Sequence, residues 1–218
     1  MTTRSFRCKG ILFDLDGVLV DSAECVARTW RTWATRHRLD PEAVISIAHG
    51  RPTAETVRLA APGLSAEAEV ASLDEGLEFT SEGIREIEGA RQLLERLPPS
   101  KWAVVTSGTR AIAEFRMRCT GLPSPSVLIS ADEIARGKPD PEGYLTAAAR
   151  LRLTADDCIV IEDAPPGIDA ARAARMPVIA IASTYPRERL SGADAVVDRL
   201  SDLSVLPNND ELDVQIAR

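Results

Sequence analysis

Two aspartates, Asp14 and Asp16, stand two residues apart directly after an apolar run near the start of the chain, in the stretch Phe-Asp-Leu-Asp-Gly. In open α/β sheets, ligands bind beyond the carboxyl ends of the strands. Carboxylates at such a strand end can act as a nucleophile or move a proton. Aspartate and glycine are also common in turns, so this pair by itself fits a catalytic site and an ordinary turn equally well.

Two later stretches also place polar residues at the end of an apolar run. Thr106, Ser107 and Gly108 end the stretch Val-Val-Thr-Ser-Gly, which offers a hydroxyl and a flexible, amide-rich turn suited to a phosphate group. Glu162 and Asp163 end the stretch Ile-Val-Ile-Glu-Asp and bring two more carboxylates. These carboxylates could instead cap the helix expected after them.

A lysine, Lys138, lies between these two stretches, in Arg-Gly-Lys-Pro-Asp. Most lysines are solvated surface residues. This chain has only Lys9, Lys101 and Lys138 among its 26 basic residues, so a lysine just before an expected helix is a candidate for the site. Four strand-end or loop segments could then converge on one crevice.

The elements that must position these residues are short apolar runs that alternate with helical stretches. The runs predict buried parallel strands at residues 10–15, 102–106, 127–130, 158–162, 178–181 and 195–197. Stretches rich in Ala, Leu and Arg predict helices at residues 89–96, 111–118, 141–151 and 167–174. This alternation predicts an α/β fold with a Rossmann-like, doubly wound parallel sheet.

Residues 22–87 break the alternation, because they contain no convincing strand. They fit consecutive amphipathic helices at residues 23–36, 41–48, 53–60 and 66–83. We therefore expect a core domain of residues 1–20 and 88–218, with an α-helical cap domain, residues 21–87, inserted after the first strand. Two linkers, near residues 20–21 and 87–89, favour hinge closure of the cap over the core. After Pro207 the polar, acidic chain fits either a short edge hairpin or a frayed end.

The composition argues against several classes of function. The net charge of −7 and the lack of a basic run argue against a nucleic-acid partner. The apolar runs are much shorter than the roughly 20 residues that cross a bilayer, and residues 1–10 lack the features of a secretory signal. The four cysteines are widely separated, so buried free thiols are expected rather than a zinc site or a redox pair. We expect a cytoplasmic monomer without a membrane partner.

Taken in order, the four stretches resemble the motif set of the haloacid dehalogenase-like hydrolases, and the resemblance covers nearly the whole chain. Within that superfamily the chain is similar to the subgroup with a helical cap after the first motif. It looks especially like the phosphatases of small sugar and polyol phosphates, the glycerol-phosphatase and 2-deoxyglucose-6-phosphatase kind. Residues 49–51 with Thr53, 101–110 and 162–168 carry this closer resemblance.

The resemblance implies a reaction in which a small phosphomonoester is hydrolysed with Mg²⁺. Asp14 would attack phosphorus and form an aspartyl-phosphate. Asp16 would protonate the leaving alcohol and then deprotonate the attacking water. Lys138 would supply positive charge between the nucleophile and the phosphate.

The same resemblance implies how the phosphate and the metal ion are held. Thr106 and the amides of Ser107 and Gly108 would bind the phosphoryl oxygens. Oxygen ligands and waters would hold Mg²⁺, as this cation prefers. The protein ligands would be Asp14, the backbone carbonyl of Asp16, Asp163 and, either directly or behind another ligand, Glu162.

Candidate substrate contacts in the cap are Trp30, His49 and Arg51. Trp30 and Trp33 lie three residues apart on one helical face, where packing in a core is the commoner role. His49 and Arg51 lie at a glycine-containing helix break. An arginine there would suit an anionic or hydroxylated substrate, and a plain surface loop fits nearly as well.

Other members of the superfamily define the alternatives. Asp16 separates the chain from the dehalogenases, and the lack of a lysine between Lys9 and Lys101 removes the Schiff base that phosphonate-cleaving relatives use. Phosphohexomutases typically carry a histidine just after the first motif, where residues 21–26 here are Asp-Ser-Ala-Glu-Cys-Val. A β-phosphoglucomutase-like phosphohexomutase is therefore the enzymatic alternative. A phosphatase of a glycosyl-phosphate natural-product intermediate and a catalytically silent binding protein are further alternatives.

Overall fold

A parallel sheet lies at the centre of the computed structural model, which describes residues 4–48, 51–76 and 81–216. In spatial order its strands are β6 (Leu128–Ile129), β5 (Trp102–Val105), β2 (Gly10–Phe13), β7 (Cys158–Glu162), β8 (Val178–Ile181) and β9 (Ala195–Val197). Each strand runs parallel to its neighbours. The order of the strands reverses around β2, and ligands bind beyond such a switch point in sheets of this kind.

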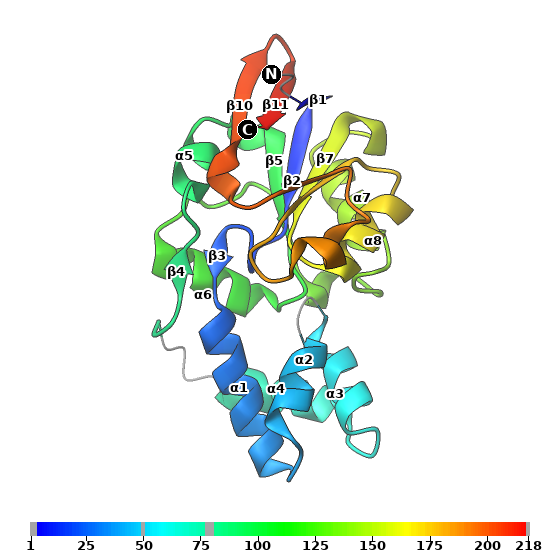
Figure 1. Cartoon of the computed structure of the whole chain (residues 1–218). Helices are drawn as coiled ribbons and strands as arrows, with labels where there is room; N and C mark the ends of the chain where they lie inside the picture. Colours follow the sequence, from blue (N-terminus) through cyan, green and yellow to red (C-terminus); the bar gives the residue numbers. More distant parts are fainter. Residues whose placement is uncertain (1–3, 49–50, 77–80, 217–218) are drawn as a thin grey trace.

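Helices cover both faces of this sheet (Figure 1). They are α5 (Ala90–Glu95), α6 (Arg110–Thr120), α7 (Glu142–Arg150) and α8 (Pro165–Ala173). Ile11 and Phe13 of β2 share an apolar cluster with α5 and α6, whereas Leu12 shares one with α7 and α8. Because side chains alternate along a strand, a sheet covered on both faces needs the continuous apolar runs seen in the sequence.

Short 3-10 helices complete several of the connections. They are η1 (Pro99–Lys101), η2 (Ala131–Glu133), η3 (Ala155–Asp157), η4 (Arg187–Leu190) and η5 (Leu200–Asp202). The capping box of η2, in which Ser130 and Glu133 exchange hydrogen bonds, fixes the chain where it leaves β6.

Four helices, which we call the cap helices, lie at one end of the sheet, at the bottom of Figure 1. They are α1 (Ala23–Arg36), α2 (Pro41–Ala48), α3 (Thr53–Ala60) and α4 (Ala66–Gly76). They pack around an apolar cluster of their own, which includes Trp30, Trp33, Val44, Ile45 and Val57. Trp33 also donates a hydrogen bond from Nε1 to Oε2 of Glu69 at 2.8 Å, which ties α1 to α4.

The chain passes between the sheet and the cap helices along a two-stranded ribbon of β3 (Val20–Asp21) and β4 (Arg85–Glu86). The two strands are antiparallel, with Val20 opposite Glu86 and Asp21 opposite Arg85. The connections between the sheet and the cap helices are thus hydrogen-bonded to each other. The domain boundaries at residues 20/21 and 87/88 stay a prediction.

The C-terminal part of the chain forms a hairpin rather than a frayed end. Its strands β10 (Leu203–Asn208) and β11 (Glu211–Ile216) pair in antiparallel fashion, and β1 (Arg4–Cys8) adds to the other side of β11. Val205, Leu212 and Val214 of this small sheet join the same apolar cluster as α5. The hairpin is therefore packed onto the core.

The predicted fold class is confirmed by the parallel sheet and its two helical layers. The strands predicted at residues 158–162, 178–181 and 195–197 have those bounds, as do the cap helices predicted at residues 23–36, 41–48 and 53–60. The helix predicted at residues 66–83 was too long, because α4 ends at Gly76 and Gly83 adopts a φ of 79°, outside the helical region.

Two other expectations can be compared with the described residues. Cys8, Cys25 and Cys158 are buried free thiols as expected, and Cys119 is free but partly exposed. No helix within the described ranges is both long and apolar enough to cross a membrane.

Candidate active site

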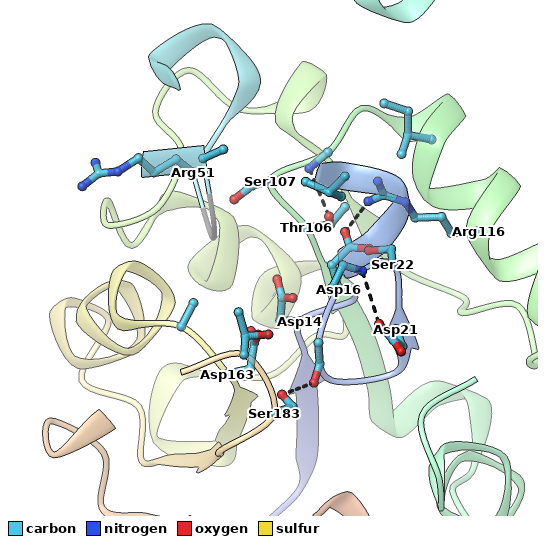
Figure 2. Close-up of a pocket in the computed structure, with 18 of the residues that line it drawn as sticks. Asp14, Asp16, Asp21, Ser22, Arg51, Thr106, Ser107, Arg116, Asp163 and Ser183 are labelled. Atoms are coloured by element: carbon cyan, nitrogen blue, oxygen red, sulfur yellow. Dashed lines mark hydrogen bonds and ion pairs between the residues drawn. The ribbon is translucent and has the colours of Figure 1, made fainter. Parts of the chain in front are cut away.

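The carboxyl ends of β2, β5 and β7 lie side by side and face the cap helices, and the side chains singled out from the sequence gather there (Figure 2). A cavity of about 400 Å³ opens at this edge. The predicted residues that line it from the sheet side are Asp14, Asp16, Thr106, Ser107, Gly108, Glu162 and Asp163. The fold therefore brings together residues from the first, second and last of the four sequence stretches.

Lys138, from the third of the four sequence stretches, lies against Asp14. Its Nζ donates a hydrogen bond to Oδ1 of Asp14, one to Oε1 of Glu162 at 2.7 Å and one to the Val105 carbonyl at 3.1 Å. The ammonium group thus uses its three donors on the ends of three adjacent strands. At 5% exposure, Lys138 is not a solvated surface lysine.

Burial and neighbouring charges shift the pKa values of these groups. Burial raises the pKa of Asp14, Lys138 lowers it, and Glu162 and Asp16 raise it, to a value of about 7. Burial opposes the charge on Lys138, but Asp14 and Glu162 outweigh it and raise the lysine pKa well above its ordinary value. Burial, followed by Glu162 and Asp14, also raises the pKa of Asp163 well above its ordinary range. A further cation at this site would favour the ionised carboxylates.

Both carboxylate oxygens of Glu162 are engaged by protein donors. Oε1 accepts hydrogen bonds from Lys138 and, at 3.0 Å, from the hydroxyl of Tyr144. Oε2 accepts from the backbone N–H groups of Asp163 at 2.8 Å and Ala164 at 2.9 Å, just before α8 begins. The contact with Oε1 orients Lys138. The contacts with Oε2 partly resemble the helix-capping role that the sequence analysis considered for Glu162 and Asp163. A role of Glu162 at the metal ion stays a prediction.

Asp16 is held from two sides by residues that the sequence analysis did not single out (Figure 2). Nη1 of Arg116 donates to Oδ2 of Asp16 at 2.6 Å, and Oγ of Ser22 donates to Oδ1 at 2.6 Å. Arg116 lies on α6, where it looks like one of several arginines of an ordinary helix. Tyr144, the partner of Glu162, is equally unmarked in the sequence of α7.

The loop after β5 presents the residues predicted to bind phosphate. The N–H of Thr106 donates to the Ile129 carbonyl at 2.9 Å and so continues the sheet. Oγ1 of Thr106 accepts the N–H of Gly108 at 3.1 Å, and the Gly108 carbonyl accepts the N–H of Ala131 at 2.9 Å. The loop is therefore fixed at both ends where it lines the cavity, just before the start of α6, an end of a helix that favours anions.

The carboxylates that line the cavity are of the type that could hold the predicted magnesium ion. Within the part of the chain that the structure describes, no three His, Cys, Asp or Glu side chains are grouped so as to hold a metal ion. Mg²⁺ keeps several waters and binds through one or two carboxylates, which Asp14 and Asp163 can supply. Gly17, with a φ of 86°, leaves room for the carboxylate of Asp163, because a Cβ at residue 17 would overlap with Oδ2 of Asp163.

An apolar wall lies on the cap side of the cavity. It consists of Val26, Trp30 and Leu73 from the cap helices. Ile87, which follows β4, and Ile112 of α6 add to the apolar lining. Trp30 thus lines the cavity, and its ring also makes a T-shaped contact with the Trp33 ring at a centroid distance of 5.4 Å. The wall can contact apolar parts of a bound molecule.

The other cap candidates differ in position. Arg51 lines the cavity, but its Nη1 pairs with Oε1 of Glu55 at 2.6 Å and its guanidinium points away from the carboxylates in Figure 2. Trp33 packs in the apolar cluster of the cap helices. His49 lies outside the described residues. Substrate contacts of Trp30, His49 and Arg51 stay predictions.

Comparison with known proteins places this site in a family. The family model for haloacid dehalogenase-like hydrolases matches residues 8–175, which include all the predicted catalytic, phosphate-binding and metal-binding residues described above. The chain belongs to this family. A solved structure of a hydrolase from Pseudomonas syringae has the same fold, with a TM-score of 0.78 at 27% identity over 88% of this chain and 93% of that one.

Three named relatives show where in the family the chain belongs. Hexitol phosphatase A of Escherichia coli (strain K12) is 42% identical over 212 residues, which cover 94% of this chain and 98% of the relative. Glycerol-1-phosphate phosphohydrolase 2 of Saccharomyces cerevisiae is 33% identical over 229 residues, covering 98% and 92%. Validoxylamine A 7'-phosphate phosphatase of Streptomyces hygroscopicus subsp. limoneus is 36% identical over 205 residues, covering 89% and 95%. The predicted phosphatase, similar to those of sugar and polyol phosphates, is confirmed.

Proposed function

We propose that this protein is a magnesium-dependent phosphatase of sugar or polyol phosphates that works through an aspartyl-phosphate on Asp14. The observation that carries the proposal is the buried Asp14 at the end of β2, paired with Lys138 and open to a cavity that the Thr106–Gly108 loop also lines. A nucleophile, a fixed cation and a phosphate-binding turn on adjacent strand ends are the parts that phosphoryl transfer needs.

In the first step, an oxygen of Asp14 forms a bond to phosphorus as the bond from phosphorus to the substrate oxygen breaks. Asp16 donates a proton to that oxygen, which leaves as an alcohol. Lys138 offsets the negative charge of the nucleophile and of the phosphoryl oxygens, and the loop amides of Ser107 and Gly108 donate hydrogen bonds to those oxygens.

In the second step, water attacks the phosphorus of the aspartyl-phosphate and Asp16 takes a proton from it. Inorganic phosphate leaves, and Asp14 returns as a carboxylate for the next cycle. The same side chain thus serves as acid and then as base, which requires that it lie within hydrogen-bonding reach of the leaving oxygen and of the water.

Asp14, Asp163 and the carbonyl of Asp16 would hold the magnesium ion. When bound, this ion supplies the positive charge that lets a carboxylate approach a phosphate dianion. The raised pKa values of Asp14 and Asp163, which come from burial and from neighbouring carboxylates, support a bound cation at this site.

The relatives support a sugar or polyol phosphate as the substrate, since one is named for hexitol phosphates and another for glycerol 1-phosphate. The apolar wall of Val26, Trp30 and Leu73 favours a second candidate, a phosphorylated sugar that carries a bulkier, less polar group. In either role we expect a cytoplasmic monomer that needs only Mg²⁺ and its small-molecule substrate.

Phosphate release from a panel of phosphomonoesters tests the proposal. The panel contains hexitol, hexose, glycerol and nucleoside phosphates and a glycoside phosphate with a bulky aglycone. We expect release with Mg²⁺, none with excess EDTA, and a loss of about 1,000-fold or more in Asp14→Asn. Asp169→Asn, which removes an exposed carboxylate from α8, is the matched control and should keep wild-type activity.

Release that persists in Asp14→Asn would contradict the assigned nucleophile. Isomerisation of a hexose phosphate without release of phosphate would instead support the phosphohexomutase. The best substrate of the panel distinguishes the two phosphatase candidates.

A further inference from the structure

Arg116 of α6 makes a close contact with Asp16, which lies in the loop after β2. Its Nη1 lies 2.6 Å from Oδ2 of Asp16, and its side chain is only 11% exposed. Ser22 holds the other oxygen, Oδ1, at 2.6 Å. In Figure 2 the guanidinium extends from the helix toward Asp16 at the edge of the cavity. Both carboxylate oxygens are thus fixed from separate elements.

Asp16 needs such support, because little else holds its side chain. Its carboxylate is 27% exposed and lies at the end of two rotatable bonds, in the loop that follows β2. A side chain that transfers a proton must stay close to the productive geometry, and second contacts usually provide this. Among the described cavity residues, Arg51 is already paired with Glu55 of α3, which leaves Arg116 to hold Asp16.

We propose that Arg116 is a positioning residue that holds Asp16 where it can protonate the leaving oxygen. The proposal rests on the proposed phosphatase function. It requires that loss of Arg116 affect proton transfer to the leaving group and spare the attack by Asp14, because Arg116 pairs with Asp16, whereas Lys138 contacts Asp14, Glu162 and the Val105 carbonyl. The ion pair has one close N–O contact, so a lysine can restore it in part.

An effect on proton transfer to the leaving group can be distinguished from an effect on the attack by Asp14 when the leaving group is varied. A sugar or polyol alkoxide is a poor leaving group and needs the proton, whereas an aryl oxide such as p-nitrophenolate leaves without one. The ratio kcat/KM reports the steps up to loss of the alcohol, and so it excludes the later hydrolysis of the aspartyl-phosphate, in which Asp16 also acts.

The experiment compares kcat/KM for the best alkyl phosphate of the panel and for p-nitrophenyl phosphate, with Mg²⁺ present. The variants are Arg116→Ala and Arg116→Lys. The matched control is Arg118→Ala, two residues along the same helix, whose side chain is 67% exposed and 3.9 Å from Glu114. Thermal unfolding of each variant establishes that it is folded.

We expect Arg116→Ala to lose about 100-fold or more with the alkyl phosphate and less than about 5-fold with p-nitrophenyl phosphate, as removal of general acid catalysis predicts. Arg116→Lys should recover part of the loss. Added guanidinium chloride should raise the alkyl phosphate activity of Arg116→Ala but not of the wild type, with sodium chloride at equal ionic strength as the control.

Equal losses with both substrates, or no loss with either, would overturn the positioning role while leaving the phosphatase proposal intact. No response of Arg116→Ala to guanidinium would overturn it as well. If the wild type releases no phosphate from either substrate in a manner that needs Asp14, it is the proposed function that fails.

Discussion

At the scale of single residues, the position of Glu162 depends on the absence of a side chain at Gly167. A Cβ at Gly167, in the first turn of α8, would overlap with Oε1 of Glu162, the oxygen that accepts from Lys138 and Tyr144. Glycine is needed there for space, because the helical backbone itself would accept other residues. The buried ion pair of Glu162 and Lys138 therefore depends on a glycine in the first turn of α8.

Gly167→Ala should therefore displace the Glu162 carboxylate from Lys138. We expect a loss of roughly 3–5 kcal/mol in the free energy of unfolding, the usual cost of breaking a buried ion pair. We also expect a fall in kcat, since Lys138 would lose one of its three acceptors. Chemical denaturation and steady-state kinetics measure the two effects.

Gly63→Ala is the matched control, because a Cβ at Gly63 would meet nothing within 4 Å. Wild-type stability of Gly167→Ala would mean that Glu162 has another accessible position in which it is equally well paired.

Single residues also show how far the sequence could predict the site. Asp14, Thr106 and Lys138 could be predicted, because each follows or precedes a recognisable element in a motif of several residues. Arg116 and Tyr144 could not, because their partners lie 100 and 18 residues away and the pairing depends on how the helices pack on the sheet. Local spacing carries no information about such contacts.

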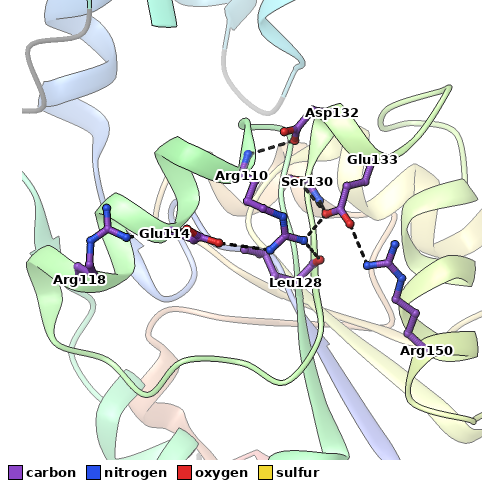
Figure 3. Close-up of polar contacts among 8 residues, drawn as sticks. All are labelled: Arg110, Glu114, Arg118, Leu128, Ser130, Asp132, Glu133 and Arg150. Carbon is purple, nitrogen blue, oxygen red and sulfur yellow. Dashed lines mark hydrogen bonds and ion pairs between the residues drawn. The ribbon is translucent and has the colours of Figure 1, made fainter.

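At the scale of elements, a polar network joins α6, the end of β6, η2 and α7 on the surface (Figure 3). Nη2 of Arg110 donates to Oε2 of Glu133 and, at 2.9 Å, to the Leu128 carbonyl. Arg150 of α7 donates to the other oxygen of Glu133 at 2.9 Å. Ser130 adds a hydrogen bond from its hydroxyl at 2.8 Å. Glu133 therefore holds two helices to one edge of the sheet.

This network should make folding stability depend on pH in the acid range. Burial acts to raise the pKa of Glu133, but hydrogen bonds from Arg150, Ser130 and Arg110 outweigh it and lower the pKa from 4.5 to about 2. The folded protein thus binds this proton less readily than the unfolded chain. The stabilisation is present above the unfolded pKa and is lost as the pH falls through 4.5 toward 2.

Glu133→Gln should lower the free energy of unfolding at pH 7 by about 2 kcal/mol, a value reduced for solvent screening of the half-exposed arginines. Its difference from the wild type should shrink toward pH 2, as denaturation curves across this range would reveal. Glu114→Gln, which removes a half-exposed partner of Arg110, should have little effect at any pH. A difference for Glu133→Gln that is constant with pH would contradict the assigned cause.

The elements that the sequence did not predict, or predicted only as one of two alternatives, share a physical reason. The central strands are covered on both faces and so must be apolar throughout, which makes them easy to find. β1, β10 and β11 form a small antiparallel sheet in which buried positions are mixed with partly buried or exposed ones along each strand. Their pairing also joins the two ends of the described chain, a contact that short-range patterns cannot reveal.

At the scale of the whole molecule, the cap helices form a unit that only the β3–β4 ribbon ties covalently to the core. Their apolar cluster is separate from the two clusters of the sheet. The core should therefore fold without them if the ribbon is closed into a hairpin.

We expect a chain in which Asn-Gly replaces residues 23–84, leaving a Ser-Asn-Gly turn between Asp21 and Arg85, to fold and unfold in one transition. With the cavity open to water, kcat/KM for the best alkyl phosphate should fall by more than about 10-fold, while p-nitrophenyl phosphate should lose less. Thermal unfolding followed by circular dichroism tests the folding of the shortened chain, and steady-state kinetics with the two substrates tests the change in kcat/KM. A shortened chain that fails to fold would show that the cap helices stabilise the sheet.

The β3–β4 ribbon also affects how this protein can evolve. Residues that face each other across an antiparallel pair lie about 5 Å apart, so any inserted segment whose ends meet at that spacing can be accommodated. Mutation, duplication or exchange within residues 23–84 can remodel the cap side of the cavity, while Asp14, Lys138 and residues 106–108 keep their places. Changes in one internal stretch of the gene can thus give a new substrate specificity among phosphate esters, while the residues of the sheet side stay the same.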